Sequence, residues 1–162
     1  MEAYGREAPD RLLLLGDILY HGPRNDLPRD YAPKKVAAAL NGIKERILAV
    51  RGNCEAEVDS LMLSFPVMAE YAILYHGERM IFATHGHHFG EDTPPPHAAG
   101  DILLNGHTHV PACREHEDYL YVNPGSVSIP KEDSPNGYMV LDGDTLYWKK
   151  LDGGETYREY KI

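Results

Sequence analysis

The sequence contains little cysteine, which excludes a scaffold built on disulfide bonds. Its 162 residues include only two cysteines, Cys54 and Cys113, and two are too few for a disulfide framework. Scarce, unbridged thiols are typical of the reducing cytoplasm, so we expect a cytoplasmic protein. Domains have about 150 residues, and we therefore predict a single domain over residues 1–162.

Long hydrophobic runs and positive charge are scarce as well. The longest apolar runs, such as residues 36–40, have about five residues, whereas a membrane span needs roughly 20. The first residues, MEAYGRE, do not form a signal peptide. Lys and Arg number 16 against 25 Asp and Glu, giving a net charge of −9. This balance excludes a general affinity for nucleic acid or for an anionic membrane, and it suits a protein that binds cations.

Short apolar runs alternate with helix-prone polar segments up to His109 and then follow one another as a β-meander. The predicted strands cover residues 11–16, 47–50, 68–75, 80–83, 102–104, 119–122, 138–141 and 145–151, and the predicted helices cover residues 33–46 and 55–64. Residues 91–100 are expected to form a surface loop, and residues 123–130 a turn followed by a short strand. This alternation predicts a mixed α/β protein with two packed sheets and helices outside.

Four apolar runs end in a residue that carries a good metal-donor atom. LLLLG is followed by Asp17, ILAVRG by Asn53, MIFAT by His85 and ILLNG by His107, with His109 two residues later. Ligands collect at the carboxyl ends of strands in α/β sheets. A lone histidine in such a place is usually a hydrogen-bonded structural residue, but four similar endings in one chain favour a shared site.

The type of these donors indicates a transition metal. They comprise one carboxylate, one amide oxygen and three imidazoles. A mixture of oxygen and nitrogen donors suits Mn²⁺, Fe²⁺, Zn²⁺ or Co²⁺ better than Ca²⁺ or Mg²⁺, which prefer oxygen alone. The sequence has no cysteine cluster of the kind that forms a closed structural zinc site. We therefore predict an open, catalytic metal site.

Five motifs carry a resemblance to a known family. GDILYHGPRN, RGNCEAEVD, THGHHFG, NGHTH and NPGSVSIPK, in this order, resemble the motifs of the calcineurin-like metallophosphoesterases, and most of all those of the bacterial YfcE-type phosphodiesterases. The resemblance runs from about Arg11 to the C-terminus. It implies two facing mixed β-sheets flanked by helices, two divalent metals at the strand ends, and the hydrolysis of phosphate esters.

The resemblance also implies a role for each donor. Asp17 would bridge the two metals, Asn53, His85 and His107 would complete the second metal site, and His109 would bind the first metal. The two oxygens of a carboxylate suit a bridge between cations roughly 3.5–4 Å apart, and such a pair can activate a water molecule. We expect Mn²⁺, with Zn²⁺, Fe²⁺, Ni²⁺ or Co²⁺ as alternatives, and one or two ions per chain.

Three further residues are candidates for catalysis. Cys54 stands where many relatives carry a histidine that is thought to protonate the leaving group, and a thiol could donate a proton there or simply fill the space. Arg24 could clamp a phosphate with its planar guanidinium or form a surface ion pair. His87 is expected beside the metal ligands or against the substrate. His88 is expected to be solvated, because two adjacent residues rarely face one centre.

The family begins with a strand that ends in Asp-x-His, followed by a helix, before the GD motif. Here fifteen residues precede Gly16, and none of them forms Asp-x-His. We therefore expect the fold to lack the first strand and most of the first helix, with residues 1–11 as the tail of that helix, ended by Gly5 and Pro9. The first metal would then keep only Asp17 and His109 as ligands, which predicts about one tightly bound ion per chain.

Two functions from different classes remain open. One is a phosphodiesterase that hydrolyses a small-molecule phosphodiester with a metal-activated water and without a covalent phosphoenzyme. The other is a weakly active or non-catalytic scaffold, because the retromer scaffold subunit of eukaryotes resembles this family in fold and works mainly by binding partners. The presence of Asp17, Asn53, His85, His107 and His109 favours the enzyme, whereas the missing Asp-x-His favours the scaffold. A homodimer or a higher homo-oligomer is also expected, since relatives often dimerise.

Overall fold

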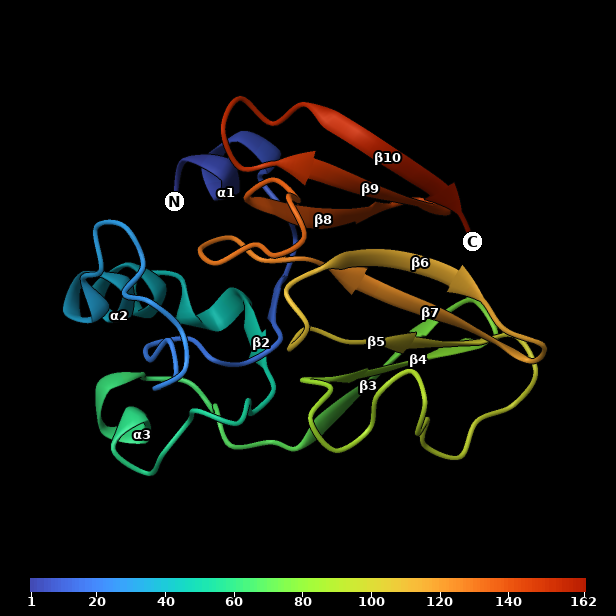
Figure 1. The fold of residues 1–162 in the computed structure, drawn as a ribbon, viewed down its shortest axis with the longest axis horizontal. Coiled ribbons are helices and arrows are strands. Elements are labelled where there is room, and N and C mark those ends of the chain that lie inside the picture. The colour runs from blue at the N-terminus through green and yellow to red at the C-terminus, as the bar shows by residue number, and fades with distance from the viewer.

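Ten strands and three short α-helices make up the chain in the computed structural model, which describes residues 1–162 (Figure 1). In chain order, the elements are α1 (Glu2–Glu7), β1 (Leu12–Leu14), α2 (Pro33–Asn41), the 3₁₀-helix η1 (Lys44–Arg46), β2 (Ile47–Ala49), α3 (Asp59–Met62), β3 (Tyr71–His76), β4 (Arg79–Thr84), β5 (Asp101–Leu104), β6 (Pro111–Glu115), β7 (Tyr119–Pro124), β8 (Gly137–Asp142), β9 (Thr145–Lys150) and β10 (Thr156–Lys161). None of the helices combines the length and the apolar composition that a membrane span requires.

The main core lies between two facing sheets. A mixed five-stranded sheet has the order β3-β4-β5-β7-β6, and an antiparallel sheet of order β10-β9-β8 lies above it in Figure 1. Strands β4, β5 and β7 run parallel, and all four residues of β5 are buried, as expected for central parallel strands. Leu146 and Trp148 of β9 pack against Ile81, Ile102 and Leu120 of the larger sheet. The predicted mixed α/β architecture of facing sheets is therefore confirmed.

A second core joins the helices to the small parallel pair β1 and β2. Helix α2 begins with Pro33, which suits the first turn of a helix because its nitrogen has no hydrogen to leave unpaired. The helix buries Ala37 and Leu40, which share one face, against Ala49 and Phe65. In Figure 1, α2 and α3 lie together on the side of the molecule where β2 is seen.

Both predicted helices are shorter than expected. The helix that begins at Pro33 ends at Asn41, because the Asn41 amide is engaged elsewhere: its Nδ2 donates to the Met62 carbonyl and its Oδ1 accepts from the Ser64 N–H. The rest of the predicted helix, up to residue 46, contains only the short 3₁₀-helix η1. The helix predicted over residues 55–64 is reduced to α3, because the Glu55 carboxylate is engaged with the backbone of other loops.

Other local predictions were wrong at polar edges and turns. No strand follows β7 within residues 125–130, where the Ser126 hydroxyl instead accepts the Ile129 N–H in a local turn. Gly5 does not end the first helix, which continues to Glu7. Strands β6 and β10 were missed, because both are edge strands in which charged residues interrupt the apolar pattern.

Candidate metal centre

Four of the predicted donors meet at the carboxyl ends of parallel strands. Asp17 follows β1 and Asn53 follows β2, which pair in parallel, while His85 follows β4 and His107 follows β5, a second parallel pair. Asp17, His107 and His109 all adopt left-handed backbone conformations, with φ of 53°, 58° and 63°. Such conformations are rare outside glycine and collect at functional sites, because the surrounding fold must impose them.

The His85 imidazole lies at the centre of the group. Its ring is buried, and its Nδ1 donates to the Leu15 carbonyl at 2.6 Å, so its Nε2 is directed at the other donors. This Nε2 lies 3.1 Å from Asn53 Oδ1, 3.1 Å from His107 Nδ1 and 3.4 Å from Asp17 Oδ2. The predicted convergence of these four residues is therefore seen in the structure.

Each of the three distances from His85 Nε2 matches the spacing of two neighbouring ligands on a transition-metal ion. An ion with bonds of about 2.0–2.2 Å holds neighbouring ligand atoms about 2.8–3.6 Å apart in tetrahedral or octahedral geometry. The observed separations of 3.1, 3.1 and 3.4 Å lie in this range. A protonated Nε2 of His85 can donate to the Asn53 and Asp17 oxygens, and a bound cation would take the place of that proton.

The protonation of the centre follows from its burial and its hydrogen bonds. Burial acts to raise the pKa of Asp17, but the His85 imidazole and the Cys54 N–H hold that pKa below its ordinary value. Burial acts to lower the pKa of His85, but Asp17 and the Leu15 carbonyl raise it. Burial lowers the pKa of His107 and that of His109, which keeps both imidazoles neutral and able to bind a metal.

His109 forms no hydrogen bond with the other four donors. Its Nδ1 donates to the Ile129 carbonyl at 2.7 Å, which leaves its Nε2 for a ligand. The loop that carries it is held from beneath by the Asn123 amide, whose Nδ2 donates to the Gly106 carbonyl at 2.6 Å and lies 3.1 Å from the Thr108 hydroxyl. Residues 123–130 therefore support the histidine loop, in agreement with the sequence analysis.

A buried carboxylate that the sequence analysis missed joins the two oxygen donors. Glu55 accepts the N–H groups of Asp17, Ile18 and Gly52 at 2.8, 2.6 and 2.5 Å. It therefore ties the loop after β1 to the loop after β2. A Cβ at Gly52 would overlap with Asp17 Oδ1, so only glycine allows this approach. Nothing in the residue type distinguishes Glu55 from an exposed glutamate; its place two residues after Asn53 was the only available signal.

Cys54 lies between the metal donors and the loop of residues 21–25. Its N–H donates to Asp17 Oδ1 at 2.9 Å, and its sulfur lies 3.2 Å from Asn53 Nδ2. Burial, reinforced by the charge of Asp17, raises the pKa of the Cys54 thiol to about 11, with Arg24 acting weakly in the opposite direction. The thiol therefore stays protonated near neutral pH, which suits a proton donor and not a nucleophile.

Arg24 and His87 border the same centre. Arg24 is exposed near Cys54 and takes part in none of the ion pairs, so the alternative of a surface ion pair is not observed. The His87 ring lies 5.3 Å from the His85 ring and 6.2 Å from the His107 ring. His88 is exposed as expected, and its ring lies 4.0 Å from that of His87.

Comparison with known proteins shows the family to which the chain is similar. Residues 1–146 match the calcineurin-like phosphoesterase superfamily domain. The phosphodiesterase YfcE of Escherichia coli K12 is 44% identical over 146 residues, which cover 90% of this chain and 79% of YfcE. A solved structure of the E. coli phosphoesterase YfcE matches with a TM-score of 0.95 at 40% identity, over 99% of this chain and 88% of that one.

One more distant structure is similar in fold alone. The vacuolar protein sorting 29 protein of Cryptosporidium parvum matches with a TM-score of 0.58 at 21% identity, covering 100% of this chain and 89% of that one. At this identity the likeness carries no information about partners or activity.

Proposed function

This chain belongs to the calcineurin-like phosphoesterase superfamily and is a metal-dependent phosphodiesterase, and we propose that Asp17, Asn53, His85 and His107 hold the ion that its reaction needs. The single observation that carries this assignment is the gathering of three donor atoms within 3.4 Å of His85 Nε2. A pure scaffold has no need to gather a carboxylate, an amide oxygen and an imidazole around a buried histidine.

We propose Mn²⁺ as the ion, with Zn²⁺, Fe²⁺, Ni²⁺ and Co²⁺ as alternatives of similar ligand preference. When bound, the ion supplies positive charge against the phosphate oxygens and lowers the pKa of a water molecule. Asp17 and His109 together offer two donors for a second ion. Two donors bind more weakly than four, so we expect about one tightly bound ion per chain and a second one only at high metal concentration.

The remaining candidates act on the phosphodiester itself. Arg24 is proposed to bind a phosphate oxygen with its exposed, unpaired guanidinium. Burial lowers the pKa of His87, so its neutral imidazole on the rim can contact the substrate. Cys54 keeps its proton and is proposed to protonate the leaving oxygen. No residue is proposed as a covalent nucleophile, so the phosphate is transferred directly to water.

The role of Cys54 predicts a dependence on the leaving group. We expect Cys54→Ala to slow the hydrolysis of a diester with a poor, alkyl leaving group about 10²-fold. Hydrolysis of a p-nitrophenyl diester should change little, because that leaving group departs without a proton. Equal slowing of both substrates would contradict a proton-donating role.

We also propose a location and an assembly state. Both cysteines are free, which supports a location in the cytoplasm.

Tyr71, Ile73 and Tyr75 lie on one face of the edge strand β3 and are 52%, 39% and 71% exposed. Exposed apolar strips of this kind are typical of interfaces between chains, which supports a homodimer or larger homo-oligomer.

A chromogenic assay tests the proposed function. The purified chain is expected to hydrolyse bis(p-nitrophenyl) phosphate with added Mn²⁺, to lose this activity with a chelator, and to regain it when Mn²⁺ is restored. Asn53→Ala should be inactive under the same conditions. An absence of turnover with Mn²⁺, Zn²⁺ and Co²⁺ alike would contradict the enzyme and favour the scaffold.

A further inference from the structure

A second group of donors lies on the rim of the candidate metal centre. Glu70 directly precedes β3, and His87 and His88 follow β4, which pairs antiparallel with β3. The pairing of Tyr71 with Thr84 brings the start of β3 next to the end of β4. One ligand atom from each of these three side chains lies within 4.8 Å of the other two.

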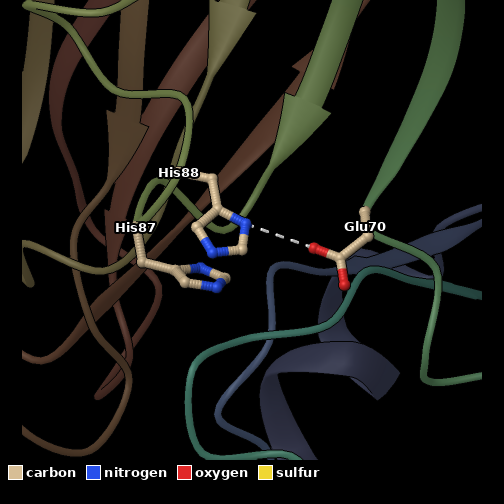
Figure 2. A group of neighbouring side chains, drawn as sticks. All are labelled: Glu70, His87 and His88. Carbon is tan, nitrogen blue, oxygen red and sulfur yellow. Dashed lines mark ion pairs between the residues drawn. The ribbon is translucent and has the colours of Figure 1, made fainter.

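The side chains are directed toward a common point. Figure 2 shows the His88 ring and the Glu70 carboxylate facing one another, with the His87 ring beside that of His88. His88 Nδ1 lies 3.4 Å from Glu70 Oε2, a separation that neighbouring ligands of a bound ion also have, at about 2.8–3.6 Å. His87 Nδ1 is buried and has no hydrogen-bond partner, which is unusual for a polar atom.

The second oxygen of Glu70 is already engaged. Its Oε1 lies 3.0 Å from Arg51 Nη1, so Arg51 fixes the carboxylate while Oε2 stays directed at His88. A plain surface pair of histidine and glutamate also exists elsewhere, between His116 and Glu91 at 3.1 Å. The rim group differs from that pair because it has a second imidazole with a buried, unpartnered nitrogen.

We propose that Glu70, His87 and His88 form a separate site for one transition-metal ion, with Zn²⁺, Ni²⁺ or Co²⁺ as the class of ligand. Two imidazoles and one carboxylate are a common zinc donor set, and water can complete the shell on this exposed rim. Imidazole donors also select against Mg²⁺ and Ca²⁺. The ligand atoms already lie within 4.8 Å of one another, and the exposed Glu70 and His88 side chains can rotate to reach bonding geometry.

An ion at this rim site would also affect the reaction. It would occupy the imidazole of His87, whose ring lies 5.3 Å from that of His85. We therefore expect an excess of Zn²⁺ to inhibit hydrolysis in the Mn²⁺-loaded protein. This expectation rests on the proposed function, whereas the binding of the rim ion does not.

Counting bound ions tests the site directly. The full chain is dialysed against excess Zn²⁺, and its metal content is compared among wild type, His88→Ala, Glu70→Gln and the control His116→Ala. We expect His88→Ala and Glu70→Gln each to lose about one ion per chain, while His116→Ala, which removes a similar pair, loses none. Asn53→Ala should keep the rim ion, so that a failure of the main centre is recognised separately.

Two results would overturn the proposal. One is an unchanged Zn²⁺ content in both His88→Ala and Glu70→Gln; the other is an equal loss in His116→Ala, which would mean that surface histidines bind zinc indiscriminately. The activity measurement adds a second readout: inhibition by excess Zn²⁺ should be at least about tenfold weaker in His88→Ala. Circular dichroism of each variant establishes that the fold is retained.

Discussion

Replacing His85 with alanine is expected to remove the tightly bound ion and to lower phosphodiester hydrolysis about 10³-fold or more. His85 is only 2% exposed, and its Nε2 is the atom around which Asn53, His107 and Asp17 gather. Without the imidazole, the ion loses a ligand and the remaining donors lose their common neighbour. The Leu15 carbonyl also loses its partner, which should cost about 1–3 kcal/mol of stability.

Elemental analysis and kcat for bis(p-nitrophenyl) phosphate check this result. The control is His76→Ala, which removes an imidazole from another part of the chain, where it pairs with Asp144 at 2.9 Å. His76→Ala should keep both its ion and its activity. If His85→Ala retained a full complement of Mn²⁺ and normal turnover, the centre would have to lie elsewhere.

Replacing Glu55 with alanine is expected to have the second largest effect, although this side chain touches no proposed substrate. Its carboxylate satisfies three backbone N–H groups, those of Asp17, Ile18 and Gly52. Leaving these buried or partly buried donors unpaired should lower the free energy of unfolding by about 3 kcal/mol, a large fraction of the usual total. The Asp17 backbone, held at φ 53°, would then relax and weaken metal binding.

A control variant separates the loss of the Glu55 hydrogen bonds from a general loss of negative charge. Glu57→Ala removes an exposed carboxylate two residues away and should leave the urea midpoint and the metal content unchanged. Glu55→Gln should fall between the two, because the amide keeps one acceptor oxygen. Urea unfolding with metal analysis of the native fraction provides both readouts. Equal stability of Glu55→Ala and Glu57→Ala would show that the contacts of Glu55 contribute little.

The four central donors could be predicted from the sequence because their signal is local. Each of Asp17, Asn53, His85 and His107 follows an apolar run, and the carboxyl ends of parallel strands bring such residues to one edge. The pairings of β1 with β2 and of β4 with β5 bear this out. The sequence was equally informative about the central strands, where burial on both faces requires continuous apolar residues.

Glu55 and Glu70 could not be predicted, because their roles depend on contacts between distant segments. Glu55 bonds to residues 37 and 38 positions away, and Glu70 faces His88 across a hairpin. Edge strands β6 and β10 were not predicted for a related reason: their outer residues are polar, so the apolar periodicity is weak. The early end of α2 follows from the contacts of Asn41 with Met62, the last residue of α3, and with Ser64, which no local pattern shows.

The most direct test of the proposed centre is anomalous diffraction from a crystal of the Mn²⁺-loaded chain, recorded at the manganese absorption edge. We expect one strong peak within about 2.0–2.3 Å of Asp17 Oδ2, Asn53 Oδ1, His85 Nε2 and His107 Nδ1. A weaker peak between Asp17 and His109 would agree with a second, loosely held ion. A strong peak elsewhere, or one that leaves out any two of those four donors, would contradict the account.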